Sequence, residues 1–206
     1  MKILVIGSEG QLGKTLKSNS FFSHSDTIFL NKKDLNLLNL KSLDKKINES
    51  LPKIIVNAAA YTNVKQAERN KKEAYAINSH AVKEIAYICK KYEILLIHIS
   101  TDFVFDGAEY SPYSESSEVS PLNIYGSSKL EGENAIKESG CKHVILRTSW
   151  LFSEYNSNFV KTVINALQDR KKMRFVDDQF GSPTSCAGLT DVIKKICDIY
   201  NEKKEI

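Results

Sequence analysis

A glycine-rich turn between an apolar strand and a helix is the feature that most limits how this chain can fold. The run KILVI, residues 2–6, is continuously apolar, as expected of a strand buried on both faces of a parallel sheet. The string GSEGQLG, residues 7–13, follows it and opens a predicted helix. Gly7 permits a tight turn, Gly10 removes a side chain that would block a pyrophosphate, and Gly13 allows close packing of the helix. Because a helix N-terminus offers free N–H groups to phosphate, the turn predicts a dinucleotide site.

Strands and helices alternate along the rest of the chain. Further strands are expected at residues 27–30, 54–56, 94–99 and 144–146, with a short one at 174–176. Helices are expected at residues 11–18, 40–49, 73–92, 123–138, 159–168 and 189–200. This order predicts an α/β fold with a Rossmann-type doubly wound parallel sheet. Since the pattern is less regular after Arg147, we expect a dinucleotide-binding domain over residues 1–150 and a small, incomplete substrate lobe over 151–206.

Charge, cysteine content and the N-terminus exclude several classes of partner. The 206 residues carry a formal net charge of +4, which suits an anionic small molecule and is too weak to favour nucleic acid. Four cysteines, at positions 89, 141, 186 and 197, form neither a Cys-x-x-Cys pair nor a cluster with zinc spacing. We therefore expect no metal site and a reducing, cytoplasmic location. The apolar run at residues 2–6 is too short for a signal peptide or a membrane span, so no membrane partner is expected.

The end of the second predicted strand bears on the choice of cofactor. An acidic residue there would bind the ribose 2′-hydroxyl of NADH. Here the strand ends in Asn31, Lys32 and Lys33, with no carboxylate before Asp34. Neutral and basic residues suit a 2′-phosphate, which favours NADPH. NADH stays open, because the two lysines are also compatible with a simple solvated surface.

A Tyr-x-x-x-Lys pair supplies the candidate chemistry. The spacing places both side chains on one helix face, where an ammonium lowers the tyrosine pKa and the tyrosine can protonate a carbonyl oxygen as hydride reaches carbon. The spacing occurs four times, at Tyr61/Lys65, Tyr87/Lys91, Tyr125/Lys129 and Tyr200/Lys204. Context favours Tyr125 and Lys129, which open a helix after a strand that ends in Ser-Thr-Asp, with Thr101 able to hydrogen-bond the same carbonyl. The alternative is a packing tyrosine.

Eight strings, in this order, carry a resemblance to a known family: GSEGQLG, NAAAYTNV, STDFVFDG, PYSE, PLNIYGSSKLEGE, ILRTSWLF, NFVKT and DDQFGSPT. From Met1 to about Thr184 the chain resembles the dTDP-4-dehydrorhamnose reductases, which are extended short-chain dehydrogenase/reductases. The resemblance implies NADPH or NADH as cofactor and a dTDP-linked keto-sugar as substrate.

The resemblance also implies a role for each matched residue. At the cofactor it implies Gly10, Gln11 and Leu12 along the pyrophosphate, Asp34 and Leu35 beside the adenine, and Ala60, Tyr61 and Thr62 after the third strand. At the reacting carbonyl it implies Tyr125 as proton donor, Lys129 as the group that holds the nicotinamide ribose and depresses the Tyr125 pKa, and Thr101 as the residue that tunes Tyr125. At the sugar nucleotide it implies Thr101, Asp102 and Trp150. A core aromatic is the alternative for Trp150, the only tryptophan.

The implied reaction is NAD(P)H-dependent reduction of the C4 keto group of a dTDP-linked 6-deoxy-hexulose to dTDP-L-rhamnose, for cell-surface polysaccharide. A non-catalytic NAD(P)-binding regulatory relative and a sugar-nucleotide epimerase or dehydratase are the alternatives, and STDFVFDG and PLNIYG favour the reductase. The sequence is compatible with a homodimer and does not fix the oligomeric state. Two features depart from the family: Asn31 stands where an acidic residue is common, and only 22 residues follow Thr184, where family members continue. We therefore expect a shortened form, a lobe completed by another subunit, or impaired activity.

Overall fold

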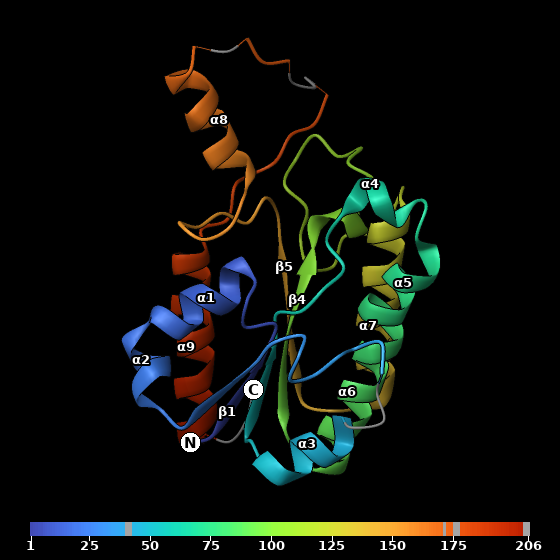
Figure 1. Ribbon diagram of the computed structural model, residues 1–206. Coiled ribbons are helices and arrows are strands. Elements are labelled where there is room, and N and C mark those ends of the chain that lie inside the picture. The colour runs from blue at the N-terminus through green and yellow to red at the C-terminus, as the bar shows by residue number, and fades with distance from the viewer. Residues whose placement is uncertain (40–42, 171, 175–177, 204–206) are drawn as a thin grey trace.

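A parallel sheet of five strands forms the centre of the molecule (Figure 1). The structure, a computed structural model, describes residues 1–39, 43–170, 172–174 and 178–203. The strands, in the spatial order β2-β1-β3-β4-β5, are β1 (Ile3–Ile6), β2 (Thr27–Leu30), β3 (Ile54–Asn57), β4 (Leu95–Thr101) and β5 (His143–Thr148). Neighbouring strands pair in parallel, so that Ile6 lies opposite both Leu30 and Asn57. The strand order reverses between β1 and β3, which is where open α/β sheets bind ligands.

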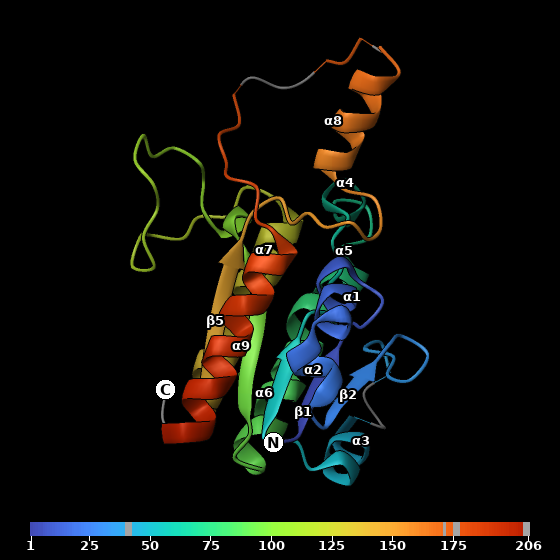
Figure 2. The ribbon, with the colours of Figure 1, turned by 90° about the vertical axis from the view of Figure 1, so that its left-hand side faces the viewer.

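Helices cover both faces of this sheet (Figures 1 and 2). One face carries α1 (Gln11–Ser18), α2 (Ser20–His24) and α9 (Cys186–Lys203); the other carries α3 (Leu43–Ser50), α5 (Lys71–Tyr75), η2 (Ala76–His80), α6 (Ala81–Lys91) and α7 (Ile124–Ser139). Alternate residues of each strand serve opposite faces, because successive side chains in a strand point to opposite sides. In β1, Ile3 and Val5 pack under α1 and α9, whereas Leu4 and Ile6 pack under α3 and α6.

The expected elements agree with the structure most closely at α1, β2 and α8 (Phe159–Gln168), which have the predicted bounds. The single helix expected at residues 73–92 consists of α5, the π-helical η2 and α6. Three short elements were not predicted, since each is too short to show a helical repeat of apolar residues in the sequence. They are α2, α4 (Val64–Ala67) and the 3₁₀ turn η3 (Asp102–Val104). The strand expected at 174–176 lies mostly outside the described residues.

The last helix packs against the sheet. Cys186, Ile193 and Cys197 of α9 are fully buried in the same core cluster as Ile3 and Leu16. Helix α9 therefore completes the helical layer on this face of the sheet, although its residues fall in the range 151–206 that the sequence suggested for the substrate lobe. Of that range, the part around α8 (Phe159–Gln168) extends beyond the carboxyl ends of the strands (Figure 2). The division at residue 150 stays a prediction.

Candidate functional site

The glycine turn after β1 borders a cavity of about 680 Å³. Gly7 has a φ of 93°, and a Cβ there would lie 2.7 Å from the backbone nitrogen of Ala59. A Cβ at Gly13 would overlap the Gly7 carbonyl oxygen and the backbone of Ser8. A Cβ at Gly10 would meet only the Gly7 oxygen within 4 Å, at 3.3 Å. Gly7 and Gly13 thus allow two backbone segments to come close together, and Gly10 leaves room on the side that faces the cavity.

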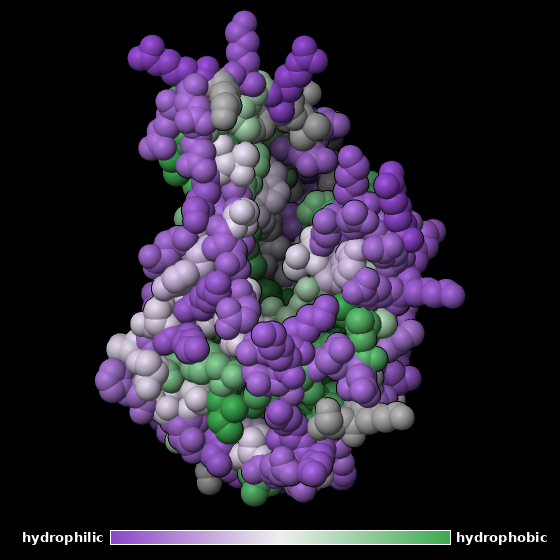
Figure 3. Space-filling view, viewed as in Figure 1, coloured by the Kyte–Doolittle hydropathy of each residue, from purple (hydrophilic) through white to green (hydrophobic). Residues whose placement is uncertain are grey.

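Most of the residues predicted at the cofactor line this cavity: Gly7, Gly10, Gln11, Leu12, Asn31, Leu35, Ala60, Tyr61 and Thr62. Four others, Gly13, Asp34, Tyr125 and Lys129, are not part of its lining. The lining also includes residues that the sequence did not single out, among them Glu73, Ile99, Leu151 and Asn156. Figure 3 shows the molecule hollowed above the strand ends, between the side that carries α1 and α8 and the side that carries α4 and α5.

The turn after β2 is closed by its own side chains. The Oδ1 of Asn31 accepts hydrogen bonds from the backbone nitrogens of Lys33 and Asp34, at 2.7 and 3.2 Å. The Oδ2 of Asp34 accepts one from the Asn31 nitrogen, at 3.0 Å. The carboxylate of Asp34 is thus engaged in the turn. Its place beside the adenine stays a prediction. Lys32, whose side chain is exposed, lines the cavity.

The Gln11 side chain ties α1 to the segment that follows β5. Its Nε2 donates to the carbonyl oxygen of Leu151 at 3.2 Å. Its Oε1 accepts from the Ser153 hydroxyl at 3.2 Å and from Asn158 Nδ2 at 2.9 Å. Asn158 also caps α8, since its Oδ1 accepts from the Lys161 nitrogen. Gln11 lines the cavity, and its amide group is occupied by this tether. Its place along a pyrophosphate stays a prediction.

Strand β4 and helix α7 bring three predicted residues to one place. The buried Thr101 hydroxyl donates to Asp102 Oδ1 at 3.0 Å and accepts from the Phe103 nitrogen at 3.2 Å. Asn123 caps α7 through the Gly126 nitrogen, which places Tyr125 in the first helical turn. The Tyr125 ring meets Phe103 edge-to-face, with centroids 5.8 Å apart.

The environment keeps Tyr125 in its phenol form. Burial raises the Tyr125 pKa, the hydrogen bond with Thr101 lowers it, and the nearby Asp102 raises it again. Burial also raises the pKa of Asp102. The sequence led us to expect a Tyr125 pKa lowered by Lys129. The net shift is upward instead, because desolvation is the largest effect. A neutral phenol is the form that can donate a proton.

Lys129 lies beneath the end of β4 in a chain of buried polar groups. Its side chain is buried, with Nζ 2.7 Å from the carbonyl oxygen of Ile99 and 3.1 Å from His98 Nε2. The Nδ1 of the fully buried His98 lies 3.2 Å from Asn57 Nδ2. The Oδ1 of Asn57 accepts from the Ala59 nitrogen, also at 3.2 Å. The sequence analysis missed His98 and Asn57, although a polar residue inside an apolar strand was the available signal.

Burial lowers the pKa of Lys129 to about 8, and the carboxylate of Glu133, one turn later in α7, acts in the opposite direction. Burial also holds the pKa of His98 well below its usual range, and Lys129 adds to this effect.

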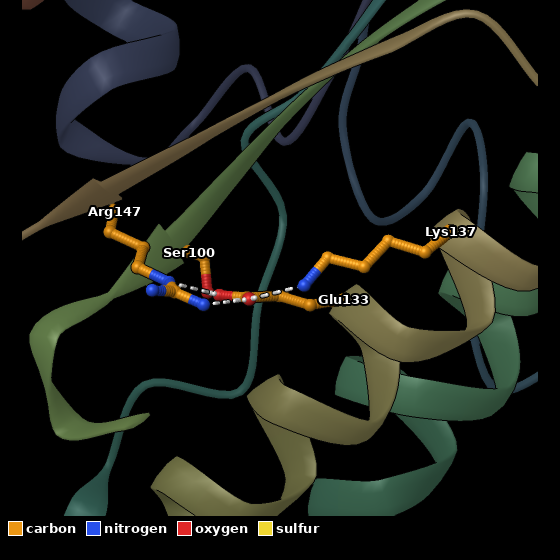
Figure 4. Close-up of polar contacts among 4 residues, drawn as sticks. All are labelled: Ser100, Glu133, Lys137 and Arg147. Atoms are coloured by element: carbon orange, nitrogen blue, oxygen red, sulfur yellow. Dashed lines mark hydrogen bonds and ion pairs between the residues drawn. The ribbon is translucent and has the colours of Figure 1, made fainter. Parts of the chain in front are cut away.

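Glu133 joins α7 to two strands (Figure 4). Its Oε1 accepts from the Ser100 hydroxyl of β4 at 2.5 Å. The guanidinium of Arg147, in β5, donates from Nε to Oε1 at 3.0 Å and from Nη2 to Oε2 at 2.7 Å. Lys137 Nζ lies 4.0 Å from Oε2 at the exposed edge. These contacts fix α7 beside the strand end that carries Thr101, and nothing in the Tyr-x-x-x-Lys spacing predicted them.

Asn78, in the π-helical turn η2, holds the loop that carries Tyr61. Its Oδ1 accepts from the Tyr61 nitrogen at 2.8 Å, and its Nδ2 donates to the Tyr61 oxygen and to the Ser128 hydroxyl, both at 3.0 Å. The loop beside the cavity and helix α7 are therefore fixed through one buried amide. The sequence signal was an asparagine on the apolar face of a predicted helix.

Trp150 lies just beyond β5, in the left-handed region with a φ of 45°. Its half-buried ring packs 5.5 Å from that of Phe159, and a Cβ on Gly181 would lie 3.3 Å from it. A bulky residue at positive φ is uncommon and is often found at functional positions. The packing agrees with the aromatic alternative, and a role for Trp150 at the sugar stays a prediction.

Three further features concern metal-binding groups, the cysteines and the length of the apolar helices. Within the described ranges no three His, Cys, Asp or Glu side chains are grouped so as to hold a metal ion. The four cysteines are buried free thiols. Of the helices that the structure describes, none combines the length and apolarity needed to cross a membrane.

Comparison with known proteins agrees with this geometry. The sequence matches the RmlD substrate binding domain family over residues 1–206. It is 36% identical over 198 residues to the dTDP-4-dehydrorhamnose reductase of Aggregatibacter actinomycetemcomitans, a match that covers 96% of this chain and 67% of that protein. The chain belongs to the dTDP-4-dehydrorhamnose reductase family.

Other family members extend the comparison. The reductase of Burkholderia thailandensis is 38% identical over 191 residues, covering 93% of this chain and 64% of that protein. The solved structure of the Bacillus anthracis reductase in complex with NADP has a TM-score of 0.90 and 39% identity, covering 95% of this chain and 69% of that chain. The chain thus spans about two thirds of the length of these dTDP-4-dehydrorhamnose reductases.

Proposed function

We propose that this chain carries out NADPH-dependent reduction of the C4 keto group of dTDP-6-deoxy-L-lyxo-4-hexulose, giving dTDP-L-rhamnose. Membership of the reductase family supports the substrate class. The observation that carries the proposal is the protonated Tyr125 phenol beside Thr101, at the carboxyl end of β4. The neighbouring cavity reaches this strand end, since Ile99 is part of its lining.

The residues of the cavity fit a nicotinamide dinucleotide. The first turn of α1 presents backbone N–H groups and the positive end of the helix dipole, and Gly10 leaves space beside them for a pyrophosphate. Lys32 is suited to a 2′-phosphate, and the Bacillus anthracis relative was solved with NADP. When bound, the reduced cofactor supplies the hydride for the sugar C4.

The side chains of this chain supply the rest of the reaction. Tyr125 donates its phenolic proton to the C4 oxygen as hydride reaches C4, so that the ketone becomes an alcohol. The Thr101 hydroxyl turns its hydrogen from Asp102 Oδ1 to the resulting phenolate and stabilises it, consistent with the direction of its effect on the Tyr125 pKa. Lys129 holds the nicotinamide ribose, and Asp102 and Trp150 contact the sugar nucleotide. The four buried free thiols support a cytoplasmic location.

The test is an assay of NADPH oxidation at 340 nm with the keto-sugar, with the product identified by chromatography. Wild type should form dTDP-L-rhamnose, and Tyr125→Phe should retain NADPH binding while its kcat falls about a hundredfold or more. Tyr87→Phe is a matched control, because Tyr87 has the same spacing to Lys91 but lies 49% exposed on α6. If wild type binds NADPH and no dTDP-4-keto-hexose oxidises it, the non-catalytic alternative is correct.

A further inference from the structure

We infer that Glu73 determines which base the dinucleotide site accepts, by receiving a hydrogen bond from the 6-amino group of adenine. The identity of the ligand, a nicotinamide adenine dinucleotide, rests on the proposed function. The role of Glu73 is argued from its place in the cavity wall and from the acceptors in that wall that already have partners.

Glu73 lies in the part of the cavity that the segment after β2 helps to form. It belongs to α5, one turn before Ile77 of η2, and both residues line the cavity. Ile77 packs against the core cluster that contains Leu35 and Leu37, which follow β2 and also line the cavity. This part of the cavity therefore has apolar walls that suit a flat heteroaromatic ring, with one half-buried carboxylate beside them.

The width of the sheet assigns this part of the cavity to the adenosine half of the ligand. Strands β1 and β3 separate β2 from β4, which ends at Thr101. Three strand spacings amount to about 14 Å. In the proposed reaction the nicotinamide must lie beside Thr101 and Tyr125. An extended dinucleotide with its pyrophosphate at the glycine turn after β1 then places its other nucleoside near the segment after β2.

Glu73 is also the side chain that still has acceptors to offer. Of the carboxylates and side-chain amides that line the cavity, it alone has no hydrogen-bond or ion-pair partner among the residues that the structure describes. The other six, whose side-chain oxygens accept a hydrogen bond or face Lys14, are Glu9, Gln11, Asn31, Asn36, Asn63 and Asn156. A ligand in this cavity therefore meets one carboxylate that needs a donor.

The chemistry of a carboxylate decides which base it favours. An ionised carboxylate can only accept, so it favours the edge of a ring that carries a donor. Adenine has such a donor in its 6-amino group. Hypoxanthine, which is similar in shape, has a carbonyl oxygen at that position and would set lone pairs against the carboxylate. A site that hydrogen-bonds one group rejects an analogue without it, because the polar group of the protein then loses its partner.

A purely structural role for Glu73 makes a different prediction. Glu73 is the acidic residue in the first turn of α5, and such a residue stabilises the positive end of a helix. Loss of this effect would lower the melting temperature or weaken the binding of all dinucleotides alike. The ratio of the affinities for two bases therefore separates base recognition from helix stabilisation.

The test compares NADPH with its deamino analogue, nicotinamide hypoxanthine dinucleotide phosphate. Both are titrated into the full chain and followed by the fluorescence of the reduced nicotinamide. Wild type should bind NADPH about tenfold or more tightly than the analogue. In Glu73→Gln the two affinities should become nearly equal, because an amide can accept from the amine or turn and donate to the carbonyl. The lost negative charge acts on both dinucleotides equally and cancels in the ratio.

Glu9→Gln is the matched control. It removes a carboxylate from the same cavity, but at the glycine turn, where Glu9 Oε2 lies 3.9 Å from Lys14 Nζ. This variant should discriminate between the two dinucleotides as wild type does. Equal affinities in wild type would overturn the inference. So would a ratio that Glu73→Gln leaves unchanged, even if that variant binds both dinucleotides more weakly or melts at a lower temperature.

These titrations need no keto-sugar, so they separate the inference from the proposed function. If the discrimination is as expected and no keto-sugar is reduced, the inference holds and the proposed function fails. If the keto-sugar is reduced and wild type binds both dinucleotides equally well, the inference fails alone. If wild type binds neither dinucleotide, both fail.

Discussion

Glu133 and Arg147 form a bidentate pair between helix α7 and strand β5, with N···O distances of 3.0 and 2.7 Å. The Glu133 side chain is 1% exposed and the Arg147 side chain 19%. A buried carboxylate is tolerated only when its oxygens are hydrogen-bonded. The pair therefore fixes helix α7, which carries Tyr125 and Lys129, against β5. That strand pairs with β4, which carries Thr101.

Removing the guanidinium should destabilise the protein strongly. Arg147→Met leaves the Glu133 carboxylate buried with fewer partners, at a cost of about 3 kcal/mol in the free energy of unfolding. Urea denaturation measures the loss. Lys137→Met is the matched control, because Lys137 is 54% exposed and reaches Glu133 only at 4.0 Å, and its cost should stay below about 1 kcal/mol. Equal losses for the two variants would contradict the role given to Arg147.

The glycines of the first turn should separate folding from cofactor binding. An alanine Cβ at position 13 would overlap Gly7 and Ser8, so Gly13→Ala should lower the melting temperature. An alanine Cβ at position 10 meets only the Gly7 oxygen and otherwise faces the cavity, so Gly10→Ala should stay folded and bind NADPH at least tenfold more weakly. Thermal unfolding and fluorescence titration with NADPH give the two readouts. Unchanged affinity in folded Gly10→Ala would exclude the pyrophosphate from this turn.

Lys32 should set the preference for NADPH over NADH. It lines the cavity at the end of β2, and a charge-assisted hydrogen bond to a 2′-phosphate would be lost in Lys32→Gln, which weakens NADPH binding about tenfold and leaves NADH binding nearly unchanged. Lys33→Gln controls for net charge, since Lys33 is also exposed but does not line the cavity. Both dissociation constants should be measured at two salt concentrations. An equal effect from the two substitutions would mean that general electrostatics, and not a phosphate contact, favours NADPH.

Burial of Lys129 should make stability depend on pH. The pKa of Lys129 in the folded protein is about 8, below the ordinary value of 10.5. Its contribution to the free energy of unfolding is therefore fully present above pH 10.5 and is lost as pH falls through about 8. Relative to Lys129→Met, wild type should therefore gain about 2 kcal/mol between pH 7.5 and 9.5. Urea unfolding at intervals across this range measures the difference, with the largely exposed Lys137→Met as control. A constant difference would show that Lys129 keeps its ordinary affinity for protons.

The features that the sequence predicted correctly are those set by residues close together in the chain. The bounds of α1 and β2 and the close approach at Gly13 follow from the local pattern, in which each glycine position permits one kind of backbone contact. The placement of Tyr125 near Thr101 was also predictable, because parallel strands present their carboxyl ends to the same side.

Features that join distant elements were not predictable in the same way. His98 contacts Asn57 and Lys129 across 41 and 31 positions, and no spacing rule connects three such elements. The net direction of the Tyr125 pKa was missed because motif reasoning counts charges and omits desolvation. Helix α9 has a plain amphipathic pattern, which identifies an apolar face but not the surface that it covers.

The Gln11 tether joins helix α1 to the segment that precedes α8. One amide at the start of α1 holds Leu151, Ser153 and Asn158, so the helix proposed to face the pyrophosphate also anchors the segment leading to α8. A ligand that displaces either partner perturbs the other, and thermodynamic reciprocity requires the effect on affinity to be the same in both directions. If a cofactor binds at α1 and a second ligand binds beside α8, this one glutamine therefore couples their affinities, whichever of the two binds first.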